Sequence, residues 1–241
     1  MTTTTKIIEK KRPGGALATR PLHFIWITDC SGSMAGDKIQ SLNHAIREAI
    51  PAMQTIAQEN PYANVLIRAV KFSDAAQWHI EEPTPVAEFK WEDLDADGLT
   101  DMGKAMLLVA GQLKMPPMTD RALPPVLVLI SDGQPTDDFD EGLAKLMELP
   151  WGKKAVRIGI AIGEDADHDV LEKFINNPDL KPLQANNAEQ LVRYIRWVST
   201  AVLKSASAPA SQAKLETAGN VPIPPLPQVT IANTLDVADV W

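Results

Sequence analysis

The chain has 241 residues and a formal net charge of −8, and 45% of its residues are hydrophobic. This length allows one full α/β domain with extensions, and the hydrophobic share is that of an ordinary globular protein. The negative charge argues against binding to duplex nucleic acid, which needs a basic face. A single cysteine excludes an internal disulfide framework, and no apolar run approaches the roughly 18 residues of a membrane-spanning helix. We therefore expect a cytoplasmic protein that binds neither nucleic acid nor membrane.

The composition divides the chain into three parts. Residues 1–20 are polar and are expected to form a flexible N-terminal arm. Residues 21–204 alternate between short β-branched runs and helical periodicity, which is typical of repeated β-α units. Residues 205–241 begin as a Ser/Ala/Pro spacer and continue through a proline-rich stretch, so they are predicted to be a Pro-containing C-terminal extension. This tail could fold back on the domain or dock on a partner.

Apolar runs predict the strands, and apolar residues at three- and four-residue spacing predict the helices. The expected strands are 22–28, 64–71, 126–131, 156–162 and 180–185, with a short antiparallel edge hairpin formed by 77–80 and 86–91. The expected helices are 37–59, 101–114, 139–149, 167–176 and 187–204. Continuous apolar strands such as 126–130 suit a parallel sheet that is covered on both faces. The predicted fold is therefore a doubly wound α/β domain with helices on both faces of the sheet.

Hard oxygen ligands follow two of these strands. Asp29, Ser31 and Ser33 come directly after the strand 22–28, and Asp132 follows the strand 126–131. Ligands of doubly wound folds bind beyond the carboxyl ends of the strands, so these residues converge if the two strands are neighbours. A third segment supplies Thr100 just before the helix predicted at 101–114. We expect Asp29, Ser31, Ser33, Thr100 and Asp132 to surround one divalent cation.

The donor set favours Mg²⁺, with Mn²⁺ and Ca²⁺ as the alternatives. Hydroxyl ligands are neutral, so only two carboxylates balance the cation and it stays electrophilic. An open coordination position would then attract an acidic side chain from a partner. No general base is evident near these residues, so the pattern favours binding over catalysis.

Each motif alone has an ordinary structural explanation, as a helix cap or a common turn. Their occurrence together and in this order favours a site. Two other functions remain open. In the first, Asp29 is the nucleophile of a haloacid-dehalogenase-like phosphatase, although that chemistry wants a second carboxylate where this chain has Ser31. In the second, the metal site is structural and a scaffold binds its partners through the C-terminal tail.

The pattern Asp29-x-Ser31-x-Ser33, then Thr100, then Asp132 resembles the metal-ion-dependent adhesion site of the von Willebrand factor type A domain. All five positions match, and the resemblance covers about residues 20–204. It implies a mostly parallel sheet with one antiparallel edge strand. It also implies that the serines and the threonine approach the metal directly or through water, while the aspartates mainly hold ordered waters.

Two further stretches, 162–167 and 194–199, resemble the bacterial tellurium-resistance TerY-like branch of that family. This resemblance implies a cytoplasmic role in the response to tellurite or other stress, with a protein kinase and a PP2C-type phosphatase as associates. Some relatives carry a cysteine-rich zinc module after the domain. This chain has only Cys30, so no such module is expected here.

Overall fold

A computed structural model describes residues 19–208 and 223–225 of the chain. Its centre is a six-stranded sheet in the order β3-β2-β1-β4-β5-β6. The strands are β1 (Arg20–Asp29), β2 (Ala63–Phe72), β3 (Ala76–Pro85), β4 (Val126–Ser131), β5 (Val156–Ile162) and β6 (Leu183–Ala185). Only β3 runs antiparallel, at the edge beside β2. The doubly wound, mostly parallel α/β sheet with one antiparallel edge strand is thus confirmed.

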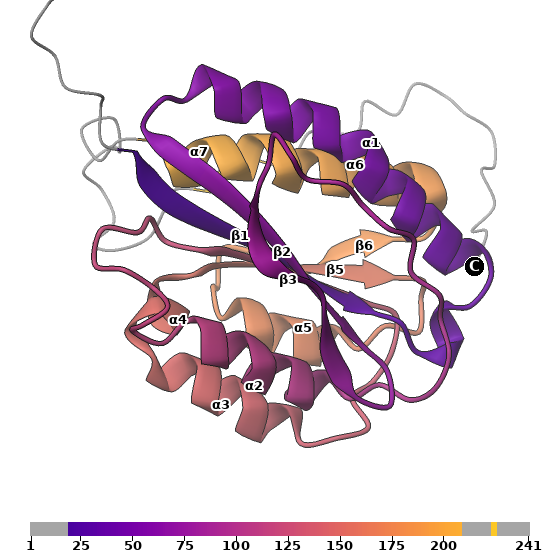
Figure 1. Cartoon of the computed structure of the whole chain (residues 1–241). Helices are drawn as coiled ribbons and strands as arrows, with labels where there is room; N and C mark the ends of the chain where they lie inside the picture. The colour runs from indigo at the N-terminus through magenta and orange to yellow at the C-terminus, as the bar shows by residue number, and fades with distance from the viewer. Residues whose placement is uncertain (1–18, 209–222, 226–241) are drawn as a thin grey trace, which may run out of the picture.

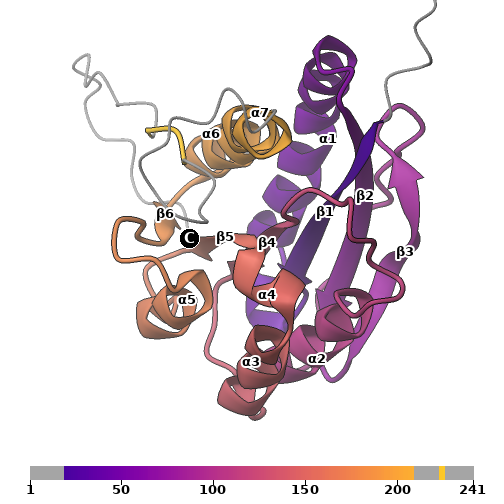
Figure 2. The ribbon, with the colours of Figure 1, turned by 90° about the vertical axis from the view of Figure 1, so that its left-hand side faces the viewer.

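The helices cover both faces of this sheet (Figure 1). One face carries α1 (Asp37–Glu59), α6 (Ala188–Trp197) and α7 (Leu203–Ser207), with a π-helical turn at Val198–Val202 between the last two. The other face carries α2 (Met102–Gln112), α3 (Phe139–Glu148), α4 (Pro150–Lys154) and α5 (His168–Ile175). The side view in Figure 2 shows the sheet between these two layers. Buried on both sides, its central strands need the continuous apolar sequence that predicted them.

Strands β1 and β4 are hydrogen-bonded neighbours in the middle of the sheet. Every residue of β4 is buried, as is every residue of β1 from Phe24 to Asp29. Their parallel register pairs Thr28 with Ile130, so the next residues along each strand, Asp29 and Ser131, lie at the same edge of the sheet. The condition on which the predicted site depended is thus met, because the ends of both strands come to one place.

The predicted edge hairpin is wrong. Residues 76–85 form the single strand β3, and residues 86–91 are not a strand. The chain beyond Pro85 instead packs onto α1: Trp91 donates its indole N–H to Asn43 Oδ1 at 2.9 Å, and Asn43 Nδ2 donates to the carbonyl of Leu94 at 2.9 Å. The aromatic side chains of this segment, which have a strand-like sequence pattern, are therefore buried against α1 without forming a strand. Strand β6 is also shorter than predicted, and the short helix α4 was not predicted.

A few residues of the C-terminal tail lie against the domain. Ile223 packs against the core, and the indole N–H of Trp197 at the end of α6 donates to the carbonyl of Pro225 at 3.3 Å. The expected N-terminal arm, apart from residues 19 and 20, and most of the tail lie outside the described residues. No helix in the described ranges combines the length and the apolar character that a membrane crossing requires.

Helices α2 and α3 approach each other through two glycines. A Cβ atom added at Gly142 of α3 would lie 2.9 Å from the carbonyl carbon of Gly103 in α2. A Cβ atom added at Gly103 would lie 2.7 Å from the carbonyl carbon of Asp138. Real Cβ contacts to backbone are longer than this, so any larger residue here must push the helices apart. The close approach fixes the segments that precede both helices, which include Thr100 and Asp132.

We predict that Gly142→Ala lowers the free energy of unfolding by about 1–3 kcal/mol, the usual cost of overpacking. The matched control is Gly111→Ala, because a Cβ at this exposed position of α2 meets nothing within 4 Å. That control should raise stability by about 0.5–1 kcal/mol through helix propensity. Urea unfolding of both variants measures the two effects. Equal stability of the two variants would contradict the close helix contact.

Candidate functional site

Asp29 is fully buried at the carboxyl end of β1. Its Oδ1 atom accepts a hydrogen bond from the backbone N–H of Ser31 at 2.8 Å. Its Oδ2 atom accepts one from the hydroxyl of Ser131 at 2.5 Å. The parallel register of β1 and β4 explains the second contact, because it places Ser131 beside Asp29. Both carboxylate oxygens are therefore held in place by the strand ends themselves.

Asp132 is the second buried carboxylate, one residue beyond β4. Its Oδ1 atom accepts a hydrogen bond from the Ser33 hydroxyl at 2.8 Å, and its Oδ2 atom accepts one from the ammonium of Lys38 at 2.5 Å. The Ser33 hydroxyl also lies 3.0 Å from the hydroxyl of Ser31. The segment after β1 and the segment after β4 thus meet through side chains, as the sequence predicted.

Thr100 reaches the same place from the segment before α2. A Cβ atom added at Gly133 would lie 3.7 Å from both Ser33 Oγ and Thr100 Oγ1, so these two hydroxyls face one small space beside Asp132. Thr136 holds the backbone of Thr100: its Oγ1 accepts from Thr100 N–H at 3.0 Å, and its own N–H donates to the Thr100 carbonyl at 3.0 Å. Within the described part of the chain, the Thr100 hydroxyl has no hydrogen-bond partner.

Backbone hydrogen bonds tie the three segments together. The N–H of Gly32 donates to the Gly98 carbonyl at 2.9 Å, and the N–H of Asp97 donates to the Cys30 carbonyl at 2.8 Å. Asp137 caps the start of α2, with its two oxygens accepting from the N–H groups of Gly103 and Lys104 at 2.8 Å each. The acidic run at 137–141 lies at the start of α3, where carboxylates commonly cap a helix. Asp138 does so for α3, but Asp137 serves a helix that precedes it in the chain.

Burial raises the pKa of Asp29, and the nearby charge of Asp132 raises it further. The hydrogen bonds from Ser131 and Ser31 oppose this rise. Burial also raises the pKa of Cys30 to about 12, with a smaller contribution from Asp29. Cys30 is thus a buried, protonated thiol at neutral pH and is not a nucleophile or a thiolate ligand.

Three residues that hold the site were not identified from the sequence. Ser131 and Thr136 were not identified because their partners are distant in sequence, and only the register of β1 and β4 marks Ser131 in hindsight. Lys38 lies at the start of α1, where a lysine is ordinarily solvent-exposed, and nothing in its neighbours predicts the contact with Asp132. All five predicted residues, by contrast, belong to the observed cluster.

The chemistry of the cluster suits a hard cation. It offers two carboxylates and three hydroxyls, the oxygen donors that Mg²⁺ and Ca²⁺ prefer. Within the described ranges, no three residues of the types His, Cys, Asp and Glu gather in a way that could hold a metal ion. Any metal bound here must therefore rely on hydroxyl oxygens, and the free hydroxyl of Thr100 is suitably placed.

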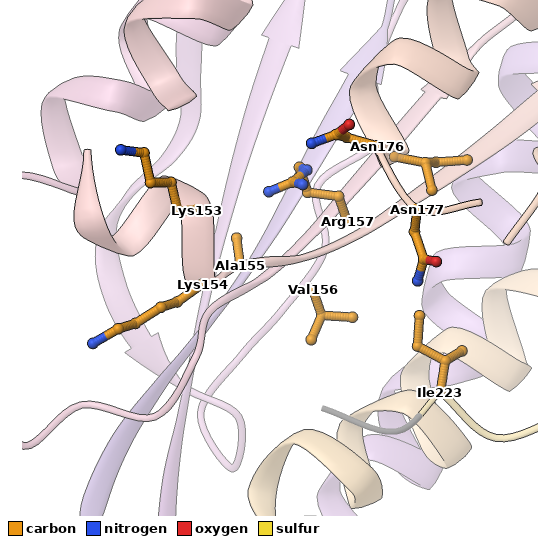
Figure 3. Close-up of a pocket in the computed structure, with 9 residues that line it drawn as sticks. Lys153, Lys154, Ala155, Val156, Arg157, Asn176, Asn177 and Ile223 are labelled. Atoms are coloured by element: carbon orange, nitrogen blue, oxygen red, sulfur yellow. The ribbon is translucent and has the colours of Figure 1, made fainter. Parts of the chain in front are cut away.

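A small pocket of about 50 Å³ lies at the opposite edge of the sheet, around the start of β5. Lys153 and Lys154 line one side of it, and Asn177 and Ile223 line the other (Figure 3). The buried guanidinium of Arg157 donates to the carbonyls of Phe174 and Gly152 at 2.7 Å each, so it caps the ends of α5 and α4. This charge complements two helix dipoles and needs no ligand to explain it.

The fold and the cluster agree with a family comparison. The model of the von Willebrand factor type A domain matches residues 25–194. The chain belongs to this family. The matched region contains all five residues of the predicted site, and the mostly parallel sheet with one antiparallel edge strand is the one that the family resemblance implied. Comparison with curated proteins gives no match.

Several solved structures share the fold. A von Willebrand factor type A protein from Catenulispora acidiphila is 15% identical with a TM-score of 0.56, covering 78% of this chain and 43% of its own. The ArnB paralog VWA2 from Sulfolobus acidocaldarius is 20% identical with a TM-score of 0.54, and the match covers 73% of this chain and 44% of that protein. Proximal thread matrix protein 1 from the mussel byssus, with a zinc-occupied MIDAS motif, is 14% identical with a TM-score of 0.58. The match covers 78% of this chain and 46% of that protein. This chain thus spans less than half the length of each.

We predict that Ser131→Ala raises the pKa of Asp29, because one carboxylate oxygen loses its hydroxyl donor. A folded-state pKa above the unfolded value means that ionised Asp29 opposes folding. Its contribution to stability therefore falls as the pH rises from the unfolded to the folded pKa, and the variant extends this loss to higher pH. At pH 7, without metal, the variant should lose about 1–3 kcal/mol of stability.

Urea unfolding across pH and carboxyl NMR of Asp29 measure these effects. The matched control is Ser199→Ala, which removes a fully buried hydroxyl that has no hydrogen-bond partner in the described part of the chain. That control should be nearly neutral at every pH. An unshifted Asp29 pKa in Ser131→Ala would show that the short contact does not stabilise the carboxylate.

Proposed function

We propose that this chain is a metal-dependent protein-binding module that recognises an acidic side chain through Mg²⁺. Ser31, Ser33 and Thr100 would supply neutral oxygen ligands, and Asp29 and Asp132 the balancing charge. When bound, the cation supplies Lewis acidity and an open coordination position for a partner's carboxylate. The observation that carries the proposal is the convergence of Ser33, Thr100 and Asp132 on one small space at the carboxyl edge of the sheet.

The surface beside this cluster suits a protein partner. Leu99, next to Thr100, has 57% of its area exposed, although it is large and apolar. A partner that reaches the cluster can also bury this side chain, and the apolar area so removed from water would add to a specific polar anchor. The N–H of Leu99 donates to Asp74 Oδ1 at 2.8 Å, which fixes the backbone under this side chain. Leu99 is thus presented on a held segment.

We also propose that this chain has no catalytic activity of its own. An aspartyl nucleophile must reach its substrate, but Asp29 is fully buried and both of its oxygens accept hydrogen bonds. His23, in β1, is half-buried, and burial together with Arg68 lowers its pKa to about 4, so it is neutral at pH 7. These features count against the haloacid-dehalogenase-like alternative and support binding.

We further propose that the module acts in a cytoplasmic response to tellurite or related stress, with a protein kinase and a PP2C-type phosphatase as associates. The support is the sequence resemblance of residues 162–167 and 194–199. In the fold, the first stretch links β5 to α5 and the second ends α6 and begins the π-helical turn. Co-purification of a tagged chain with each class of enzyme, before and after tellurite exposure, tests this part of the proposal.

We predict that Mg²⁺ stabilises the chelated protein by mass action. At a concentration 100-fold above its Kd, the ion should add about 2.7 kcal/mol, or about 5–10 °C in Tm for a domain of this size. Asp29→Ala should abolish the shift. The control Glu164→Gln, an exposed carboxylate at the same edge of the sheet, should keep it. A shift that survives Asp29→Ala would place the metal elsewhere.

We predict that Leu99→Ala weakens capture of the partner at least tenfold without changing Tm. The matched control is Leu107→Ala, which removes a similarly exposed leucine from α2. An affinity pull-down with wild type and both variants, each with Mg²⁺ and with chelator, measures the effect. Capture that is insensitive to chelator would favour the alternative in which the metal site is structural and the C-terminal tail binds the partner.

A further inference from the structure

Lys38, which is partly buried, forms an ion pair with the buried carboxylate of Asp132. Its ammonium lies 2.5 Å from Asp132 Oδ2, and the two side chains are only 16% and 0% exposed. Every other ion pair among the described residues has at least one side chain that is 43% exposed or more. Exposed pairs contribute little to stability, whereas a buried carboxylate depends on its partner. Lys38 is therefore the cation that balances Asp132 in this structure.

The ion pair occupies one of the oxygens that a metal would need. Asp132 Oδ1 already accepts from Ser33, and Oδ2 is taken by Lys38. A divalent cation that draws on this carboxylate must therefore share it with the ammonium or displace it. The two positive charges also repel each other at short range.

Building on the proposed function, we infer that Lys38 is an internal counter-cation that competes with the metal for Asp132 and makes metal binding depend on an acidic ligand. Asp29 and Asp132 carry two negative charges, and Lys38 carries one positive charge. Addition of a divalent cation leaves the cluster with one net positive charge, which an incoming carboxylate neutralises. Without Lys38, the metal-bound cluster is already neutral and gains less from that carboxylate.

The test compares the metal affinity of full-length wild type and Lys38→Met, measured by calorimetry with Mg²⁺ and with Mn²⁺ alone. Methionine keeps the length of the side chain and removes its charge. We expect the variant to bind either ion at least tenfold more tightly than wild type. In chelator, the variant should have a lower Tm than wild type, because Asp132 loses its counter-charge. Lys38→Gln, which can still donate a hydrogen bond to Asp132, serves if the methionine variant does not fold.

Lys104→Met is the matched control. Lys104 pairs with Asp101 at 2.5 Å beside Thr100, but its side chain is 54% exposed. The substitution Lys104→Met removes the same charge from the same edge of the sheet. It should change the metal affinity by no more than about twofold, because exposed charges are screened. Equal tightening in Lys104→Met would overturn the inference, because the effect would then be general electrostatics.

A further arm adds 100 mM acetate as a small carboxylate. Acetate should tighten metal binding more in wild type than in Lys38→Met, and an equal effect in both would overturn the coupling to an acidic ligand. If wild type binds metal and Lys38→Met has the same or weaker affinity, the inference fails while the proposed function stands. If neither protein binds metal, both fail.

Discussion

Two buried carboxylates at the ends of neighbouring parallel strands are the constraint around which this edge of the molecule is arranged. Asp29 and Asp132 lie close enough for the charge of Asp132 to raise the pKa of Asp29, and both side chains are buried. Burial of like charges is costly unless hydrogen bonds or cations offset it. Asp29 is stabilised by neutral donors, the N–H of Ser31 and the hydroxyl of Ser131, whereas Asp132 has a hydroxyl and an ammonium. This difference makes Asp132 the carboxylate that responds to a change of cation.

The surrounding segments are coupled to these carboxylates through the backbone. The segment after β1 and the segment before α2 share two hydrogen bonds, Gly32 to Gly98 and Asp97 to Cys30. The segment after β4 holds Thr100 through Thr136 and the start of α2 through Asp137. The glycine contact between α2 and α3 then fixes the base of both. A ligand that orders one segment must therefore act on all three.

The parts of this structure that follow from local sequence were predictable, and the parts that follow from tertiary contact were not. The apolar runs of β1, β4 and β5 and the periodicity of α1 indicate one element each, and the polar residues at the strand ends marked the site. The segment after Pro85 was assigned wrongly because its buried aromatics pack on α1 through Asn43, a contact 48 residues apart. Lys38 was missed for the same kind of reason: its partner is 94 residues away, and only the fold brings its ammonium to the buried carboxylate of Asp132.

The points where the described chain enters and leaves all lie at the edge of the sheet opposite the carboxylates. Arg20 begins β1 beside Tyr62, Ser207 at the end of α7 accepts from Asn60, and Ile223 lies by the start of β5. The described ends of the chain and the carboxylate cluster therefore lie at opposite edges of the sheet. Among the described residues, the places where the chain enters and leaves the domain thus leave the edge that bears the carboxylates open to a second macromolecule.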